Sequence, residues 1–147
     1  WSSCYQENRK IGAVVVRQKR ILTTGYNGAP AGVESCMQRG ECLRRKMNIP
    51  SGTRHEVCYA VHAEQNAILN ARGKNLEGCS IYVNLFPCHD CARNIIQSGI
   101  KTVYYLEDKY ADTDSIKASK YMFEKAKVEL IQLTPQVDKI EINFNKK

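Results

Sequence analysis

The chain has 147 residues, of which 43% are hydrophobic and 25% charged, values that suit a globular domain rather than a disordered chain. No apolar run approaches the roughly 18 residues of a membrane helix, and no apolar stretch follows a basic start as in a secretory signal. The seven cysteines, an odd number, argue against a disulfide framework and favour a reducing compartment, the cytoplasm. The net charge of +7 fits an anionic partner such as a nucleotide or nucleic acid.

Hydrophobic periodicity predicts the elements in chain order. A β-branched run and a second short strand open the chain as a hairpin, and helices with apolar residues at helical intervals then alternate with short apolar strands. Glycine follows the first two of these helices, as is common at helix ends. The predicted strands are 11–17, 20–25, 80–85, 101–106 and 127–133, and the predicted helices are 62–72, 88–98 and 114–126.

This order of elements predicts an α/β fold. Alternating helices and strands favour a sheet that is parallel over much of its width and covered on both faces, and the opening hairpin makes that sheet mixed. Ligands of such sheets sit at the carboxyl ends of strands. Residues 33–60 show no clean period, and a loop of that length inside a compact domain is usually functional. We therefore expect a single domain over 1–147, with a Cys-rich insertion at about 33–60.

Two short motifs at predicted helix starts carry candidate metal chemistry. Cys88 and Cys91 follow Pro87 at i, i+3, so they share one face of a helix start, where the helix dipole favours thiolates. With the imidazole of His62 they make three ligands, one fewer than a closed structural zinc site, which leaves a position for water. Glu64 would stand beside that water and move protons without binding the metal. Either motif alone has weaker readings, such as a redox pair, but together they favour catalytic zinc.

The sequence resembles the deoxycytidylate deaminases from about Ile11 to Leu133. The resemblance implies a cytidine-deaminase-like three-layer α/β/α sandwich with a mixed five-stranded sheet. It also implies hydrolytic deamination of dCMP to dUMP and ammonia, feeding thymidylate synthesis. The family usually begins with a helix before the first strand, and this chain begins with Trp1, so we expect an N-terminal segment to be absent from it. The matching stretches are Gly25-Tyr26-Asn27-Gly28, 62–68, 86–91, 98–106 and 108–110.

The resemblance further implies a second, structural zinc held by residues in or near the insertion. Cys4, Cys36, His55 and Cys58 would close a Cys₃His tetrahedron, which would order a long loop of little apolar content. Cys42 is the substitute for Cys4 in this set. The alternative is that these side chains are ordinary thiols and a surface histidine.

Several further residues are candidates for binding the substrate or an effector. Glycines that flank Asn27 allow a ligand close to the backbone, although the same residues also suit a plain turn. Paired arginines match phosphate oxygens but also occur on solvated faces, and an aromatic ring near the pocket would stack on a pyrimidine. The candidates are Gly25, Tyr26, Asn27, Gly28, Arg44, Arg45 and Tyr110.

The resemblance also implies a homo-oligomer, a hexamer or similar, activated by dCTP and inhibited by dTTP, usually with Mg²⁺. Two other classes of function stay open. One is a polynucleotide deaminase of the tRNA type, which shares the zinc motif and needs a basic groove. The other is a non-catalytic competence or assembly protein, against which the intact Glu64 argues.

Overall fold

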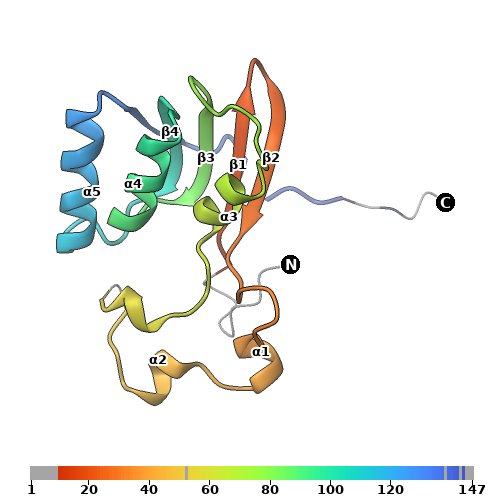
Figure 1. The fold of residues 1–147 in the computed structure, drawn as a ribbon, viewed down its shortest axis with the longest axis vertical. Helices are drawn as coiled ribbons and strands as arrows, with labels where there is room; N and C mark the ends of the chain where they lie inside the picture. Colours follow the sequence, from red (N-terminus) through yellow and green to blue (C-terminus); the bar gives the residue numbers. More distant parts are fainter. Residues whose placement is uncertain (1–9, 52, 138, 143, 145–147) are drawn as a thin grey trace.

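The computed structural model of the protein describes residues 10–51, 53–137, 139–142 and 144 (Figure 1). In this part of the chain a mixed five-stranded sheet has the order β2-β1-β3-β4-β5, with β1 antiparallel to both neighbours and β3, β4 and β5 parallel. The mixed sheet predicted from the sequence is confirmed. The strands are β1 (Gly12–Arg17), β2 (Arg20–Tyr26), β3 (Ser80–Leu85), β4 (Thr102–Glu107) and β5 (Glu129–Gln132).

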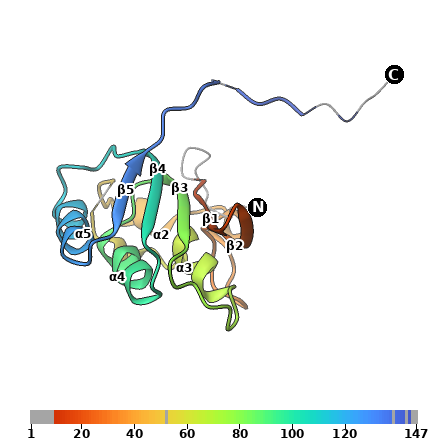
Figure 2. The ribbon, with the colours of Figure 1, turned by 90° about the horizontal axis from the view of Figure 1, so that it is seen from above.

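The longer helices lie on one face of this sheet, as the view from above shows (Figure 2). They are α3 (Ala63–Leu69), α4 (His89–Gln97) and α5 (Asp114–Lys125), each close to a predicted helix. Helix α3 ends earlier than predicted, and Arg72 and Gly73 just beyond it adopt positive φ angles of 46° and 84°. None of the helices described is long and apolar enough to cross a membrane.

The segment 33–60 contains short helices that the sequence analysis did not predict. They are α1 (Cys36–Arg39), α2 (Leu43–Lys46) and a 3₁₀ turn, η2 (His55–Val57), and α1 and α2 lie apart from the sheet (Figure 1). A helix of four residues completes hardly more than one turn, so it shows no hydrophobic period. Its start is nonetheless marked, since Ser35 and Gln38 form a reciprocal capping box at α1.

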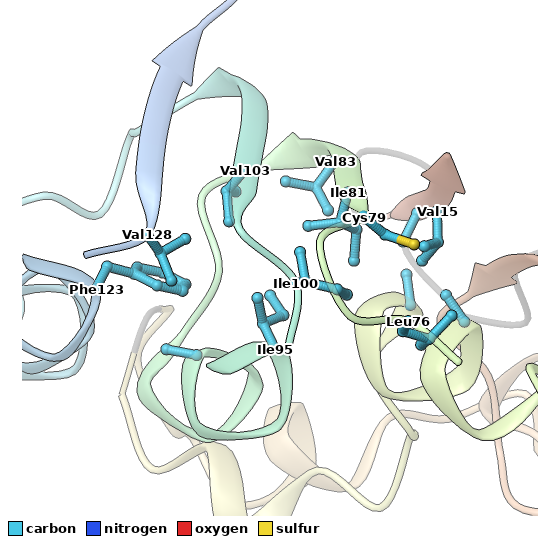
Figure 3. Packing of buried hydrophobic residues seen from close by; sticks show 14 of the residues in the cluster. Val15, Leu76, Cys79, Ile81, Val83, Ile95, Ile100, Val103, Phe123 and Val128 are labelled. Atoms are coloured by element: carbon cyan, nitrogen blue, oxygen red, sulfur yellow. The ribbon is translucent and has the colours of Figure 1, made fainter. Parts of the chain in front are cut away.

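The hydrophobic core fills the space between the sheet and these helices (Figure 3). Alternate strand residues such as Val15, Ile81 and Val103 point into it and are fully buried, as the two-residue period of a strand requires. Ile95 of α4 and Phe123 of α5 meet them from the helical layer. This packing fixes where α3 and α4 begin relative to the ends of β2 and β3.

Helix α3 is also tied to the edge strand β2 by polar side chains. Asparagine and lysine side chains on one side of α3 and the segment after it donate hydrogen bonds of 2.7–3.3 Å to backbone carbonyls of β2. These bonds occupy acceptors that an edge strand otherwise offers to another chain. The pairs are Asn66 with Tyr26, Asn70 with Thr24 and Lys74 with Leu22.

We predict that Gly25→Ala destabilises the protein by about 1–3 kcal/mol, as overpacking in a closed core does. A Cβ at Gly25 would lie 2.1 Å from the carbonyl oxygen of Ala63 and 2.4 Å from the backbone nitrogen of Ala67, so α3 would have to shift. Urea denaturation measures the effect. Gly12→Ala is the matched control, because its Cβ would meet only one atom, at 4.0 Å. Equal stabilities of the two variants would contradict the prediction.

Candidate functional site

The three predicted zinc ligands lie at the beginnings of two neighbouring helices. His62 is the N-cap of α3 and Cys88 is the N-cap of α4, both with extended backbone angles, and Cys91 lies in the first turn of α4. An N-cap residue precedes the helix, so its side chain can point off the helix end. The bridge between Gly28 and Val61 holds the segment that leads into α3.

The donor atoms of these side chains converge on one point. Nδ1 of His62 lies 3.4 Å from Sγ of Cys88 and 3.3 Å from Sγ of Cys91, and all three donor atoms lie within 4.8 Å of one another. Tetrahedral zinc with Zn–S of about 2.3 Å and Zn–N of about 2.0 Å separates nitrogen from sulfur by about 3.6 Å. The donor set and its spacing therefore fit zinc, with a fourth position left for another ligand.

The charges of these groups point to a cation among them. A hydrogen bond from the thiol of Cys91 and the facing imidazole of His62 lower the pKa of Cys88 to about 3. The Cys88 sulfur in turn raises the pKa of His62 to about 9 and the pKa of Cys91 well above its usual range. Protons thus hold the three donors together, and a divalent cation would take the place of those protons.

Glu64 lies in the first turn of α3, beside this group. Its side chain is buried at 4% exposure, and burial raises the pKa of its carboxyl, an effect that the nearby His62 opposes. It lines the same pocket as His62 and Cys88. A buried carboxyl at the mouth of a metal site is placed to exchange protons with a bound molecule.

The pocket is formed by both the sheet and the segment 33–60. Arg44, which is only 5% exposed, lines it and donates to the carbonyl oxygens of Pro50 and Arg54. Across the pocket, the hydroxyl groups of Ser51 and Tyr110 form a hydrogen bond of 2.9 Å. The residues between α1 and α3 are thereby joined to the segment that follows β4.

The structure distributes the candidate contacts of the glycine-flanked turn unevenly. Asn27 lines the pocket, and its side-chain oxygen accepts a 2.9 Å hydrogen bond from the backbone nitrogen of Ile11. Gly25 is instead buried in β2 against α3, and Tyr26 is exposed at its edge. Of the two paired arginines, Arg45 is exposed and outside the pocket lining.

The candidates for a second zinc are only partly gathered. Cys36, His55 and Cys58 all line the pocket, but within the described ranges the search for three close metal-ligating side chains finds only the group around His62. The sulfur of Cys36 lies 3.4 Å from the hydroxyl of Tyr59. Cys4 lies outside the described residues, so the second zinc stays a prediction.

Two pocket residues escaped the sequence analysis. Lys109 and Ser115 both line the pocket, and Ser115 Oγ lies 2.8 Å from Nδ1 of His89. Lys109 stands beside Tyr110 in the sequence, which is a signal that was available. Ser115 reaches the pocket only because α5 begins there, and no local pattern marks it.

The comparisons with known proteins agree with this geometry. The family model of the cytidine and deoxycytidylate deaminase zinc-binding region matches residues 1–107. The chain belongs to this family. The predicted enzyme class, a deaminase, and the predicted zinc are confirmed at the level of this zinc-binding deaminase family.

Individual members of the family and a solved structure are similar over most of the chain. Deoxycytidylate deaminase of Homo sapiens is 40% identical over 139 residues, 94% of this chain and 75% of that protein. The dCMP deaminase of cyanophage S-TIM5, in complex with dCMP and dUMP, has a TM-score of 0.62 at 29% identity, covering 84% of this chain and 80% of that chain. ComE operon protein 2 of Bacillus subtilis (strain 168) is 43% identical over 100 residues, 67% of this chain and 48% of that protein.

We predict that Cys88→Ser lowers the zinc content of the purified protein by one ion per chain, because two remaining ligands bind zinc far more weakly than three. Metal analysis of the dialysed protein measures the content. Cys79→Ala is the control, since that thiol is also buried but belongs to the hydrophobic core. Unchanged zinc in Cys88→Ser would remove this residue from the ligand set.

Proposed function

We propose that the protein deaminates dCMP to dUMP and ammonia. The observation that carries the proposal is one pocket that holds three zinc-fitting donors, the buried carboxyl of Glu64 and a buried cation, Arg44. The names of the human and cyanophage relatives support the choice of substrate.

In this mechanism His62, Cys88 and Cys91 hold the metal, and Glu64 moves the protons. Bound zinc supplies a Lewis acid that lowers the pKa of water. The carboxylate of Glu64 takes a proton from the water that adds to C4 of the ring, gives it to N3, and then passes a proton to the departing amine. One residue serves as base and acid because each transfer restores its charge. Its burial keeps bulk water from competing for these protons.

The phosphate of a nucleotide needs a cation in the same pocket, and we assign it to Arg44, with Lys109 on the opposite wall. A guanidinium has five N–H donors. Two bonds hold Arg44 to backbone carbonyls, which leaves donors for an anion. Asn27 is assigned to the sugar or the base edge, and the ring of Tyr110 to the face of the pyrimidine, because both line the pocket.

The loss of cytosine absorbance on incubation tests the substrate. We expect a fast reaction with dCMP, a slow one with deoxycytidine, which lacks the phosphate, and none with a tRNA anticodon stem. A preference for the tRNA would replace the proposal by a polynucleotide deaminase. No reaction with any of the three would favour the non-catalytic assembly role instead.

We predict that Glu64→Gln lowers the rate with dCMP by at least about 10²–10⁴-fold, the usual contribution of a general acid–base group. The amide keeps the shape of the side chain but carries no exchangeable carboxyl proton, so zinc content and fold are expected to stay unchanged. The same assay measures it, with Glu124→Gln on the exposed face of α5 as control. A variant that keeps more than about a tenth of the rate would take the proton transfers away from Glu64.

We also propose a second, structural zinc held by Cys36, His55 and Cys58, with Cys4 or Cys42 as the fourth ligand. The support is that the three lie together on the pocket wall formed by a segment with few apolar contacts. The prediction is two zinc ions per wild-type chain. Cys58→Ser is expected to remove the ion that Cys88→Ser leaves and to lower the melting temperature, because metal binding contributes to folding. One ion per wild-type chain would contradict the second site.

Finally, we propose a cytoplasmic homo-oligomer, a hexamer or similar, that dCTP activates and dTTP inhibits, with Mg²⁺ bound to the triphosphate. The backbone at Gly28 and the basic residues near it suit an anion, and the net charge of +7 suits a triphosphate. Regulation further requires that the two triphosphates favour different states of the assembly.

We predict that saturation curves for dCMP shift to lower concentration with dCTP and Mg²⁺ and to higher concentration with dTTP and Mg²⁺. Initial rates across a range of dCMP concentrations measure the shift. Light scattering under the same conditions gives the mass. Three superimposable curves would remove the regulation, and the mass of a single chain would remove the assembly.

A further inference from the structure

The last part of the chain is an extended arm with large exposed apolar side chains. The C-terminal arm comprises residues 136–144, of which 138 and 143 lie outside the described residues. Ile140, Ile142 and Phe144 alternate with polar residues, the pattern of a strand with one apolar face. They are 80%, 70% and 88% exposed, and Val137 is 58% exposed. Such a row of exposed apolar residues typically marks an interaction site.

The arm leaves the body after β5 and runs away from it (Figures 1 and 2). Its tether contains Pro135, whose ring fixes φ and which pushes Thr134 toward an extended backbone. An extended tether carries the arm outward rather than back onto its own sheet. The partner of the arm is therefore a separate molecule.

The sheet offers a matching apolar surface. Helices α3, α4 and α5 cover one face, and on the opposite face one cross-strand row runs over all five strands (Figure 2). In the middle of this row the rings of Tyr82 and Tyr104 stack, with centroids 4.4 Å apart and planes 5° apart, and Tyr82 is 36% exposed. The row, called the tyrosine row below, consists of Thr24, Val14, Tyr82, Tyr104 and Ile131.

The tyrosine row suits the arm better than the edge of the sheet does. The carbonyls of β2 already accept hydrogen bonds from Asn66, Asn70 and Lys74, so a strand added to that edge would have to displace them. The row itself contains no charged side chain, and neither do the apolar positions of the arm. Apolar side chains therefore meet an apolar face without burying a charge.

We propose that the C-terminal arm of one copy packs on the tyrosine row of a second copy, and that the second copy returns the contact. A two-fold axis makes both contacts identical, as in most homodimers. Burial of four large apolar side chains per arm removes on the order of 500 Å², so two arms approach the roughly 1,000 Å² of a specific interface. The inference rests on the homo-oligomer proposed above and names one interface within it.

The mass of the full-length protein in light scattering tests this interface. Ile140→Asp combined with Phe144→Asp is expected to lower the mass at equal protein concentration, because charges replace the apolar face of the arm. Lys139→Gln combined with Glu141→Gln changes the alternate positions of the same arm and is expected to keep the wild-type mass. Circular dichroism checks that each variant is folded. A wild-type mass for the aspartate variant would overturn the arm but leave the oligomer, whereas a monomeric wild type would overturn both.

A mixing experiment separates exchange between copies from packing within one copy. A chain that ends at Pro135 has the row but no arm, and Tyr82→Glu has the arm but a charged row. We expect each alone to have a lower mass than the wild type, and an equimolar mixture to regain mass because intact arms meet intact rows. A mixture that regains nothing would overturn the proposal in favour of packing within one chain. Deamination of dCMP is not measured, so the result stands apart from the proposed reaction.

Discussion

The site depends on two helices that begin at the same place. A nitrogen and two sulfurs from positions 26 and 29 residues apart must lie within about 4 Å of one another, which no single helix can achieve. The protein solves this with His62 and Cys88 as N-caps, whose side chains project beyond the ends of α3 and α4. The close approach at Gly25, where α3 rests on β2, fixes the position of the imidazole. The packing of the core and the fit for zinc are therefore one constraint.

Strong local patterns made the sheet, the three long helices and the ligand group predictable. Both ligand motifs are short, and their chemistry follows from residue type and spacing alone. The short helices at 36–39 and 43–46 were missed because four residues carry no period, although Ser35 and Gln38 had the spacing of a capping box. Ser115 was missed for another reason, since only the tertiary fold brings the start of α5 to the pocket.

The segment 33–60 contributes to the pocket through the same contacts that order it. A buried guanidinium is tolerated only when it is hydrogen-bonded, and Arg44 meets this condition through carbonyls of its own loop. Its bonds shape the loop while its charge stays in the pocket. The hydrogen bond between Ser51 and Tyr110 then spans from this loop to the segment after β4. Such a bridge narrows the way in, which favours a mononucleotide over a long polynucleotide.

Strand β3 connects the two faces of the sheet. Ile81 and Val83 lie in the core beneath the helices, and Tyr82 between them points to the opposite face. The same strand ends at Leu85, three residues before Cys88. A contact made on Tyr82 by another copy would therefore act on the strand that leads directly to a zinc ligand. Assembly alters deamination through this route only if β3 has two arrangements that bind the partner unequally, since a partner with equal affinity for both shifts neither.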